Sequence, residues 1–154
     1  MKLTKHLSLS EVIKSGTAKR LGIDNNPTPE HMQNILLIAE KVFEPVREHF
    51  GKPLYVSSGY RSEALNDAIK GSSSTSQHCR GEALDLDAQV YGGFTNKELF
   101  EYIKENLIFD QLIWEYGNDD EPDWVHVSYT NETVNRKEVL RVERVDGLSQ
   151  YRFI

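Results

Sequence analysis

The most regular hydrophobic pattern of the chain lies in its first third. Apolar side chains recur there at three- and four-residue steps, at Met32, Ile35, Leu36, Ala39, Val42, Phe43 and Val46. This spacing is typical of a helix that packs one apolar stripe against a core. Thr28 suits the N-cap and Pro29 the first turn, so the pattern predicts a helix from there to about His49. Pro45 falls late in this helix, where a proline favours a kink or an early end.

Shorter patterns predict the other elements. Helices are expected at residues 8–15, 62–70 and 95–107, and strands at residues 53–57, 82–87, 111–115, 124–129 and 138–145. The clearest strand alternates polar and apolar residues from Glu82 to Asp87, as a half-buried strand does. This mixture predicts an α+β fold, with a small, mostly antiparallel sheet flanked by helices.

Length and composition narrow the class of protein. The 154 residues suit a single domain, residues 1–154, that is large enough to bury a core. The formal net charge of -6 argues against general nucleic-acid binding, which needs clustered Lys and Arg. The single cysteine, Cys79, excludes an internal disulfide and a multi-cysteine zinc finger. No apolar stretch is long enough to span a membrane, and the N-terminal residues lack the pattern of a secretory signal.

Three residues from separate segments have the chemistry of a metal site. His78 lies in a predicted loop and Asp85 in a predicted strand seven positions later, and Gly81 between them allows the chain to turn. His126 follows on another predicted strand. Two imidazoles and one carboxylate suit zinc and leave its fourth tetrahedral position to water. Such an open site is what metal-assisted hydrolysis needs.

A hydrolytic site also needs a base and a group that stabilises negative charge. Asp123 lies three residues before His126 and could reach the same site if the chain turns between them, because residues three apart in a regular strand face opposite ways. Glu115, at the end of a predicted strand, and Glu121 are rival carboxylates for the base. Arg61 offers bidentate donors for a carboxylate or a developing oxyanion.

Three motifs contain these candidates. They are Ser76-x-His78-x-x-Gly81-x-Ala83-x-Asp85, Asp123-Trp124-x-His126 and the earlier Ser58-Gly59-Tyr60-Arg61-Ser62. With them, roughly residues 55–129 resemble the M15 zinc peptidases, which include D-Ala-D-Ala carboxypeptidases, vancomycin-resistance dipeptidases and phage L-alanyl-D-glutamate endolysins. The resemblance implies the fold that this family shares with the Hedgehog signalling domain, a small antiparallel sheet flanked by helices.

The resemblance also implies roles for individual residues. His78, Asp85 and His126 would bind Zn²⁺, and Asp123 would be the general base. Many relatives have Glu, or in one branch His, near the position of Asp123, and Glu115 and Glu121 therefore stay open as alternatives. Arg61 would bind the substrate and stabilise the transition-state oxygen, and Ser76 would lie near the substrate carboxylate.

We therefore expect a zinc metallopeptidase that hydrolyses a peptide bond in peptidoglycan stem peptides, with the metal-bound water activated by a carboxylate. Carboxypeptidase, dipeptidase and endopeptidase activity all remain open at this point. We expect a monomer, made in the cytoplasm from a bacterial or phage gene, that acts on the cell wall once it is released or delivered. The alternative is a catalytically silent zinc-containing module for cell-wall or virion recognition, because the Hedgehog domain belongs to the same fold.

Overall fold

The computed structural model describes residues 1–69, 72–73 and 75–154 of the chain. Its α-helices are α1 (Leu9–Ile13), α2 (Gly16–Leu21), α3 (Pro29–Ile38), α4 (Glu44–Phe50), α5 (Glu63–Ala68) and α6 (Asn96–Asn106). A π-helical segment, η1 (Ala39–Phe43), joins α3 to α4, and a short 3-10 helix, η2 (Gln77–Arg80), precedes the second strand. The strands are β1 (Tyr55–Ser58), β2 (Ala83–Asp87), β3 (Gln111–Glu115), β4 (Trp124–Ser128), β5 (Glu138–Val145) and β6 (Leu148–Phe153).

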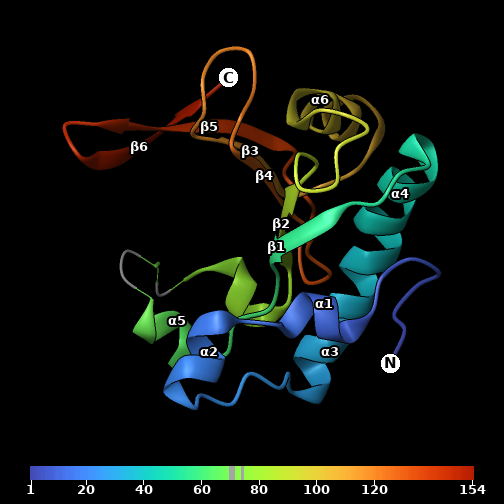
Figure 1. The fold of residues 1–154 in the computed structure, drawn as a ribbon, viewed down its shortest axis with the longest axis vertical. Helices are drawn as coiled ribbons and strands as arrows, with labels where there is room; N and C mark the ends of the chain where they lie inside the picture. The colour runs from blue at the N-terminus through green and yellow to red at the C-terminus, as the bar shows by residue number, and fades with distance from the viewer. Residues whose placement is uncertain (70–71, 74) are drawn as a thin grey trace.

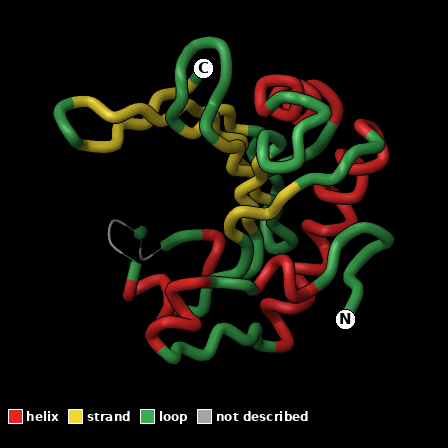
Figure 2. The backbone as a smooth tube through the Cα atoms, in the orientation of Figure 1, coloured by secondary structure: helices red, strands yellow, loops and turns green. Residues whose placement is uncertain are grey.

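The strands form one six-stranded mixed sheet in the order β1-β2-β4-β3-β5-β6. Strands β3 and β5 run parallel, whereas the pairs β1–β2, β2–β4, β3–β4 and β5–β6 are antiparallel. The prediction of an α+β fold is confirmed, and the parallel pair makes the sheet mixed. The β5–β6 hairpin extends beyond the rest of the sheet, away from α3, α4 and α6 (Figures 1 and 2).

Alternation along the central strands separates a buried face of the sheet from a polar one. One face contributes Leu84, Leu86, Leu112, Trp114, Val125 and Val127 to the main hydrophobic core. Helices α3, α4 and α6 supply the other side of this core, with side chains such as Ile38, Val46 and Phe100. Because successive side chains of a strand point to opposite faces, Asp85 and His126 lie on the face away from this core. The core thus fixes the strands that carry the polar residues.

The predicted long helix is present as one continuous run from α3 through η1 to α4. Thr28 caps it as expected, because its hydroxyl accepts the backbone N–H of His31 at 3.2 Å. The helix continues through Pro45 to Phe50 instead of ending early. The π-helical segment ends two residues before this proline, and its wider turn accommodates a residue that cannot donate a backbone hydrogen bond. Gly51, in the left-handed conformation, ends the helix.

Helix α2, the 3-10 helix η2 and strand β6 were not predicted. Helix α2 begins at Gly16, directly after the helix predicted at residues 8–15, because Ser15 caps a new helix by accepting the Ala18 N–H. Strand β6 is exposed along its whole length and therefore shows no core-facing alternation. The Asp146–Gly147 turn before it has positive φ at both residues and is a strong hairpin signal in the sequence.

The strands predicted at residues 111–115 and 138–145 are present with these bounds, and the remaining predicted elements are present with shifted ends. The first strand begins at Tyr55 and extends to Ser58. The helix expected at residues 62–70 runs from Glu63 to Ala68, and residue 70 lies outside the described part of the chain. No helix among the described residues is long and apolar enough to cross a membrane.

Candidate metal centre

Side chains from η2, β2 and β4 meet on the polar face of the sheet. Asp85 and His126 are direct partners in the β2–β4 pairing, so both side chains stand side by side on one face. His78 approaches them from η2, which Gly81 ends in the left-handed conformation. Each of the three residues offers a ligand atom, and these atoms all lie within 4.8 Å of one another. The structure therefore brings together the three residues that the sequence selected.

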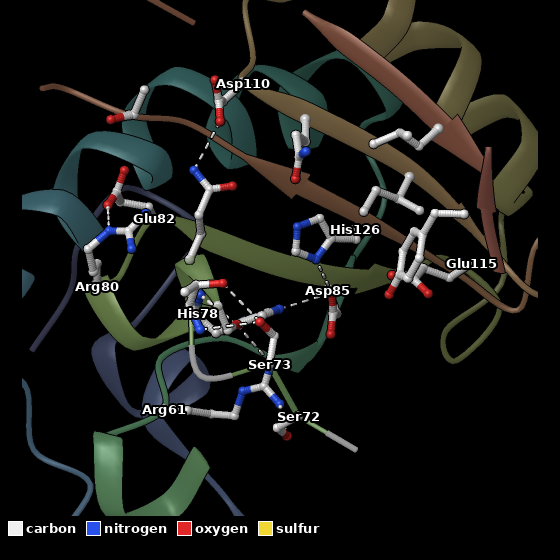
Figure 3. Close-up of a pocket in the computed structure, with 18 of the residues that line it drawn as sticks. Arg61, Ser72, Ser73, His78, Arg80, Glu82, Asp85, Asp110, Glu115 and His126 are labelled. Carbon is white, nitrogen blue, oxygen red and sulfur yellow. Dashed lines mark hydrogen bonds and ion pairs between the residues drawn. The ribbon is translucent and has the colours of Figure 1, made fainter. Parts of the chain in front are cut away.

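The three side chains point toward a common centre (Figure 3). Oδ1 of Asp85 lies 3.3 Å from Nε2 of His78 and 3.0 Å from Nδ1 of His126. The other ring nitrogen of His78, Nδ1, lies 2.7 Å from the carbonyl oxygen of Gly59. Donation to this carbonyl assigns the proton of neutral His78 to Nδ1 and leaves Nε2 free to bind a metal ion.

The donor set fits a divalent transition metal such as zinc. Burial by itself would raise the pKa of the Asp85 carboxyl, but the charges and hydrogen bonds of His78 and His126 outweigh it and lower this pKa. Asp85 is therefore ionised at neutral pH, as a carboxylate ligand must be. Two imidazole nitrogens and one carboxylate oxygen leave room for a fourth ligand in a tetrahedral arrangement. Cys79, next to His78, is not part of the group.

The centre lies in a cleft of about 990 Å³. One wall contains Arg61 and the described serine and threonine residues that follow α5. The β5–β6 hairpin, which lies across from α5 in the ribbon view (Figure 1), forms a second wall, and Leu140, Arg144 and Tyr151 of this hairpin line the cleft. The centre is therefore open to a ligand that lies between the two walls.

Of the three candidate bases, Glu115 is the one that lines the cleft. It pairs with Trp124 across β3 and β4, two residue pairs along from the Ile113–His126 pair and therefore on the same face. Its residue is only 8% exposed, and within the described part of the chain no side-chain hydrogen bond or ion pair holds its carboxylate. Burial, and secondarily the charge of Asp85, raises its pKa to about 7, against an opposing effect of His126.

Asp123 and Glu121 lie elsewhere. The Asp123 side chain is exposed and is not among the cleft residues, and its backbone N–H donates to the Glu115 carbonyl at 2.9 Å. The Glu121 carboxylate accepts the backbone N–H of Asn96 at 2.7 Å, at the start of α6. The geometry therefore favours Glu115, which the sequence offered only as an alternative to Asp123.

Arg61 and Ser76 line the same cleft as the three candidate ligands. The Arg61 backbone N–H donates to the His78 carbonyl at 3.1 Å, so the position of Arg61 is tied to that of a candidate ligand. Its guanidinium donates to the hydroxyls of Ser72 and Ser76 over long distances of 3.4 Å, and no carboxylate among the described residues pairs with it. Ser76 also accepts the His78 N–H at 3.2 Å and caps η2. Arg61 is thus a cation in the cleft that is available to an anionic ligand.

A buried carboxylate that the sequence did not single out supports the far end of the cleft. Asp110 is 3% exposed and accepts from Arg136 Nε at 2.9 Å and Nη2 at 2.7 Å. It also accepts from Gln77, the residue before His78, at 3.1 Å. These hydrogen bonds, those of Arg136 first, lower the pKa of Asp110. Asp110 thereby connects η2 to the segment between β4 and β5.

Comparison with known families identifies the same region. The family model described as Peptidase M15 matches residues 5–128, which include His78, Asp85, Glu115 and His126. None of the curated proteins compared with the chain matches it. The match ends at the last residue of β4, so β5 and β6 lie outside it.

Proposed function

The chain belongs to the M15 peptidase family, and we propose that it is a zinc-dependent metallopeptidase that hydrolyses a peptide bond in peptidoglycan stem peptides. The observation that carries the proposal is the convergence of His78, Asp85 and His126 in an open cleft. The stem-peptide substrate is an inference from the resemblance of the motifs to cell-wall peptidases.

The three ligand candidates and their surroundings suit this chemistry. Zinc held there supplies a Lewis acid that polarises a peptide carbonyl and makes water more acidic. The hydrogen bond from His78 to the Gly59 carbonyl orients the imidazole, and neighbouring histidines keep Asp85 ionised. The protein thus contributes a preformed set of donors.

Glu115 is the base in this proposal. A carboxyl group with a pKa of about 7 is ionised in a large fraction of molecules at neutral pH and can also hold a proton there. It can therefore take a proton from the attacking water and deliver it to the leaving amine. General acid–base catalysis of this kind contributes roughly 10²–10⁴-fold to a rate.

Arg61 is the substrate-binding cation. It lies beside His78 and has no carboxylate partner among the described residues, so its guanidinium is available to a substrate carboxylate or to the charge that develops on the carbonyl oxygen. The hydroxyls of Ser72 and Ser76 keep the guanidinium at the wall of the cleft.

The decisive experiment incubates the zinc-loaded chain with purified peptidoglycan fragments and identifies the products by mass spectrometry. Hydrolysis that a chelator abolishes and zinc restores supports the proposal, and the product masses identify the bond. Intact fragments despite full zinc occupancy would contradict it and favour a catalytically silent binding module.

Two variants separate the candidate bases. Glu115→Gln should retain zinc and lose at least about 100-fold in kcat, the low end of general-base contributions. Asp123→Asn is the matched control, because it removes an exposed carboxylate directly before β4, the strand that carries His126. A large loss in Asp123→Asn with little loss in Glu115→Gln would return the role of base to Asp123.

A further inference from the structure

The β5–β6 hairpin lies outside the family match but forms part of the cleft. The match ends at residue 128, whereas Arg144 and Tyr151 on the hairpin line the cleft together with Glu115. The strand register explains why Arg144, Tyr151 and Glu115 lie on the same face of the sheet. Glu115 pairs with Val142, and Val142 pairs with Tyr151, so this row of side chains crosses from β3 to β6 on the side of the metal centre.

Arg144 contacts an aromatic ring rather than an acid. Its guanidinium carbon lies 5.0 Å from the centroid of the Tyr116 ring. The Tyr116 hydroxyl is 2.8 Å from that of Ser149, the residue paired with Arg144, and its ring lies 5.5 Å from the ring of Trp124. A cation–π contact of this kind pairs the guanidinium with no acid, so its N–H donors are available to a ligand.

The neighbouring arginines of the hairpin differ in this respect. Arg141 forms ion pairs with Asp119 at 2.8 Å and Glu143 at 2.7 Å, and Arg152 lies 3.5 Å from Glu143. Within the described part of the chain, no carboxylate pairs with Arg144. In a chain with a net charge of -6, this leaves Arg144 on one wall of the cleft and Arg61 on the other as cations without acidic partners among the described residues.

We propose that the hairpin is a substrate-binding wall, in which Arg144 binds a carboxylate on the side of the scissile bond opposite to the one held by Arg61. This inference rests on the proposed peptidase function. The substrate is then an acidic peptide with a carboxylate on each side of the bond that is cleaved. Tyr151 and the Tyr116–Trp124 pair would pack against the peptide between them.

The test uses the synthetic stem pentapeptide L-Ala-γ-D-Glu-L-Lys-D-Ala-D-Ala and two derivatives. One derivative has the α-carboxylate of D-Glu converted to an amide, and the other has the C-terminal carboxylate converted. Binding is measured by calorimetry on the full chain in chelator, where no hydrolysis interferes, and cleavage is measured on the zinc-loaded chain.

In the parent chain each amide should weaken binding about tenfold, as expected for one charge-assisted contact. The parent should therefore prefer a free carboxylate over an amide at each of the two positions. In Arg144→Gln this preference should disappear at one position and persist at the other. Arg144→Lys, which keeps the charge, should retain part of the lost preference. Arg152→Gln is the matched control because Arg152 is an exposed arginine of the same hairpin and does not line the cleft. This variant should keep both preferences.

The outcomes separate this inference from the proposed function. If Arg144→Gln keeps both preferences, the inference is wrong, whether or not the chain cleaves the peptide. If the zinc-loaded chain cleaves none of the peptides but Arg144→Gln loses one preference in binding, the proposed function fails and the carboxylate site stands.

Discussion

Replacing Glu115 by glutamine should change how the stability of the metal-free chain depends on pH. The carboxyl group lies in the cleft and its residue is 8% exposed. Burial raises its pKa from 4.5 to about 7. The folded chain therefore keeps a proton that the unfolded chain loses between these two pH values. In this window the free energy of unfolding of the parent falls as pH rises, relative to a variant that cannot ionise at this position.

The size of the effect follows from the difference between the two pKa values. A difference of about 2.5, at about 1.4 kcal/mol for each pH unit, corresponds to about 3 kcal/mol. Glu115→Gln should thus gain about 3 kcal/mol relative to the parent as pH rises from 4.5 to above 7. The gain should be fully present above pH 7 and absent below pH 4.5.

Urea unfolding in chelator, followed by tryptophan fluorescence at a series of pH values, measures this difference. Asp123→Asn is the control, because it removes the exposed carboxylate of Asp123, which does not line the cleft. Zinc should shrink the gain of Glu115→Gln, since a nearby cation favours the ionised carboxylate of the parent. Parallel stability curves for the parent and Glu115→Gln in chelator would refute the burial of this group in the folded chain.

Three further predictions concern the metal and its supports. A chelator should abolish release of new amino groups from stem peptides, and added zinc should restore it. Gly59→Ala should lower the Tm and weaken zinc binding at least about tenfold in a competition titration. An added Cβ would collide with the Val12 carbonyl and displace the carbonyl that accepts from His78. Asp110→Asn should lower the free energy of unfolding by about 2 kcal/mol at neutral pH, because it weakens a charged, bidentate contact with Arg136. Urea titrations should show this loss vanishing as pH falls through the lowered pKa of Asp110.

Local patterns predicted the elements that are amphipathic or capped. The long helix was predicted because the residues that it buries against the sheet are apolar, and these residues recur at the spacing of a helix. Helix α2 and strand β6 left weaker imprints, since each has few core residues or none. The Asp146–Gly147 pair is the sequence signal from which the turn and the following strand β6 can be predicted.

The candidate base shows that local patterns do not predict which strands are neighbours in the sheet. Alternation along a strand says which residues share a face of that strand, so it separates Asp123 from His126 unless the chain turns between them. It does not say which strand lies alongside. Strand β3 pairs with β4 in a register that sets Glu115 opposite Trp124, and this pairing puts Glu115 on the face of His126.

The sequence by itself determined the α+β class and the long helix, because local spacing of apolar residues carries both, and its residue types and motifs selected the three side chains of the candidate metal centre. The tertiary structure decided which carboxylate faces that centre and that Arg144 and Tyr151 form its second wall. Both depend on contacts between strands distant in the chain, whose order and register follow from packing of the whole sheet rather than from any local pattern.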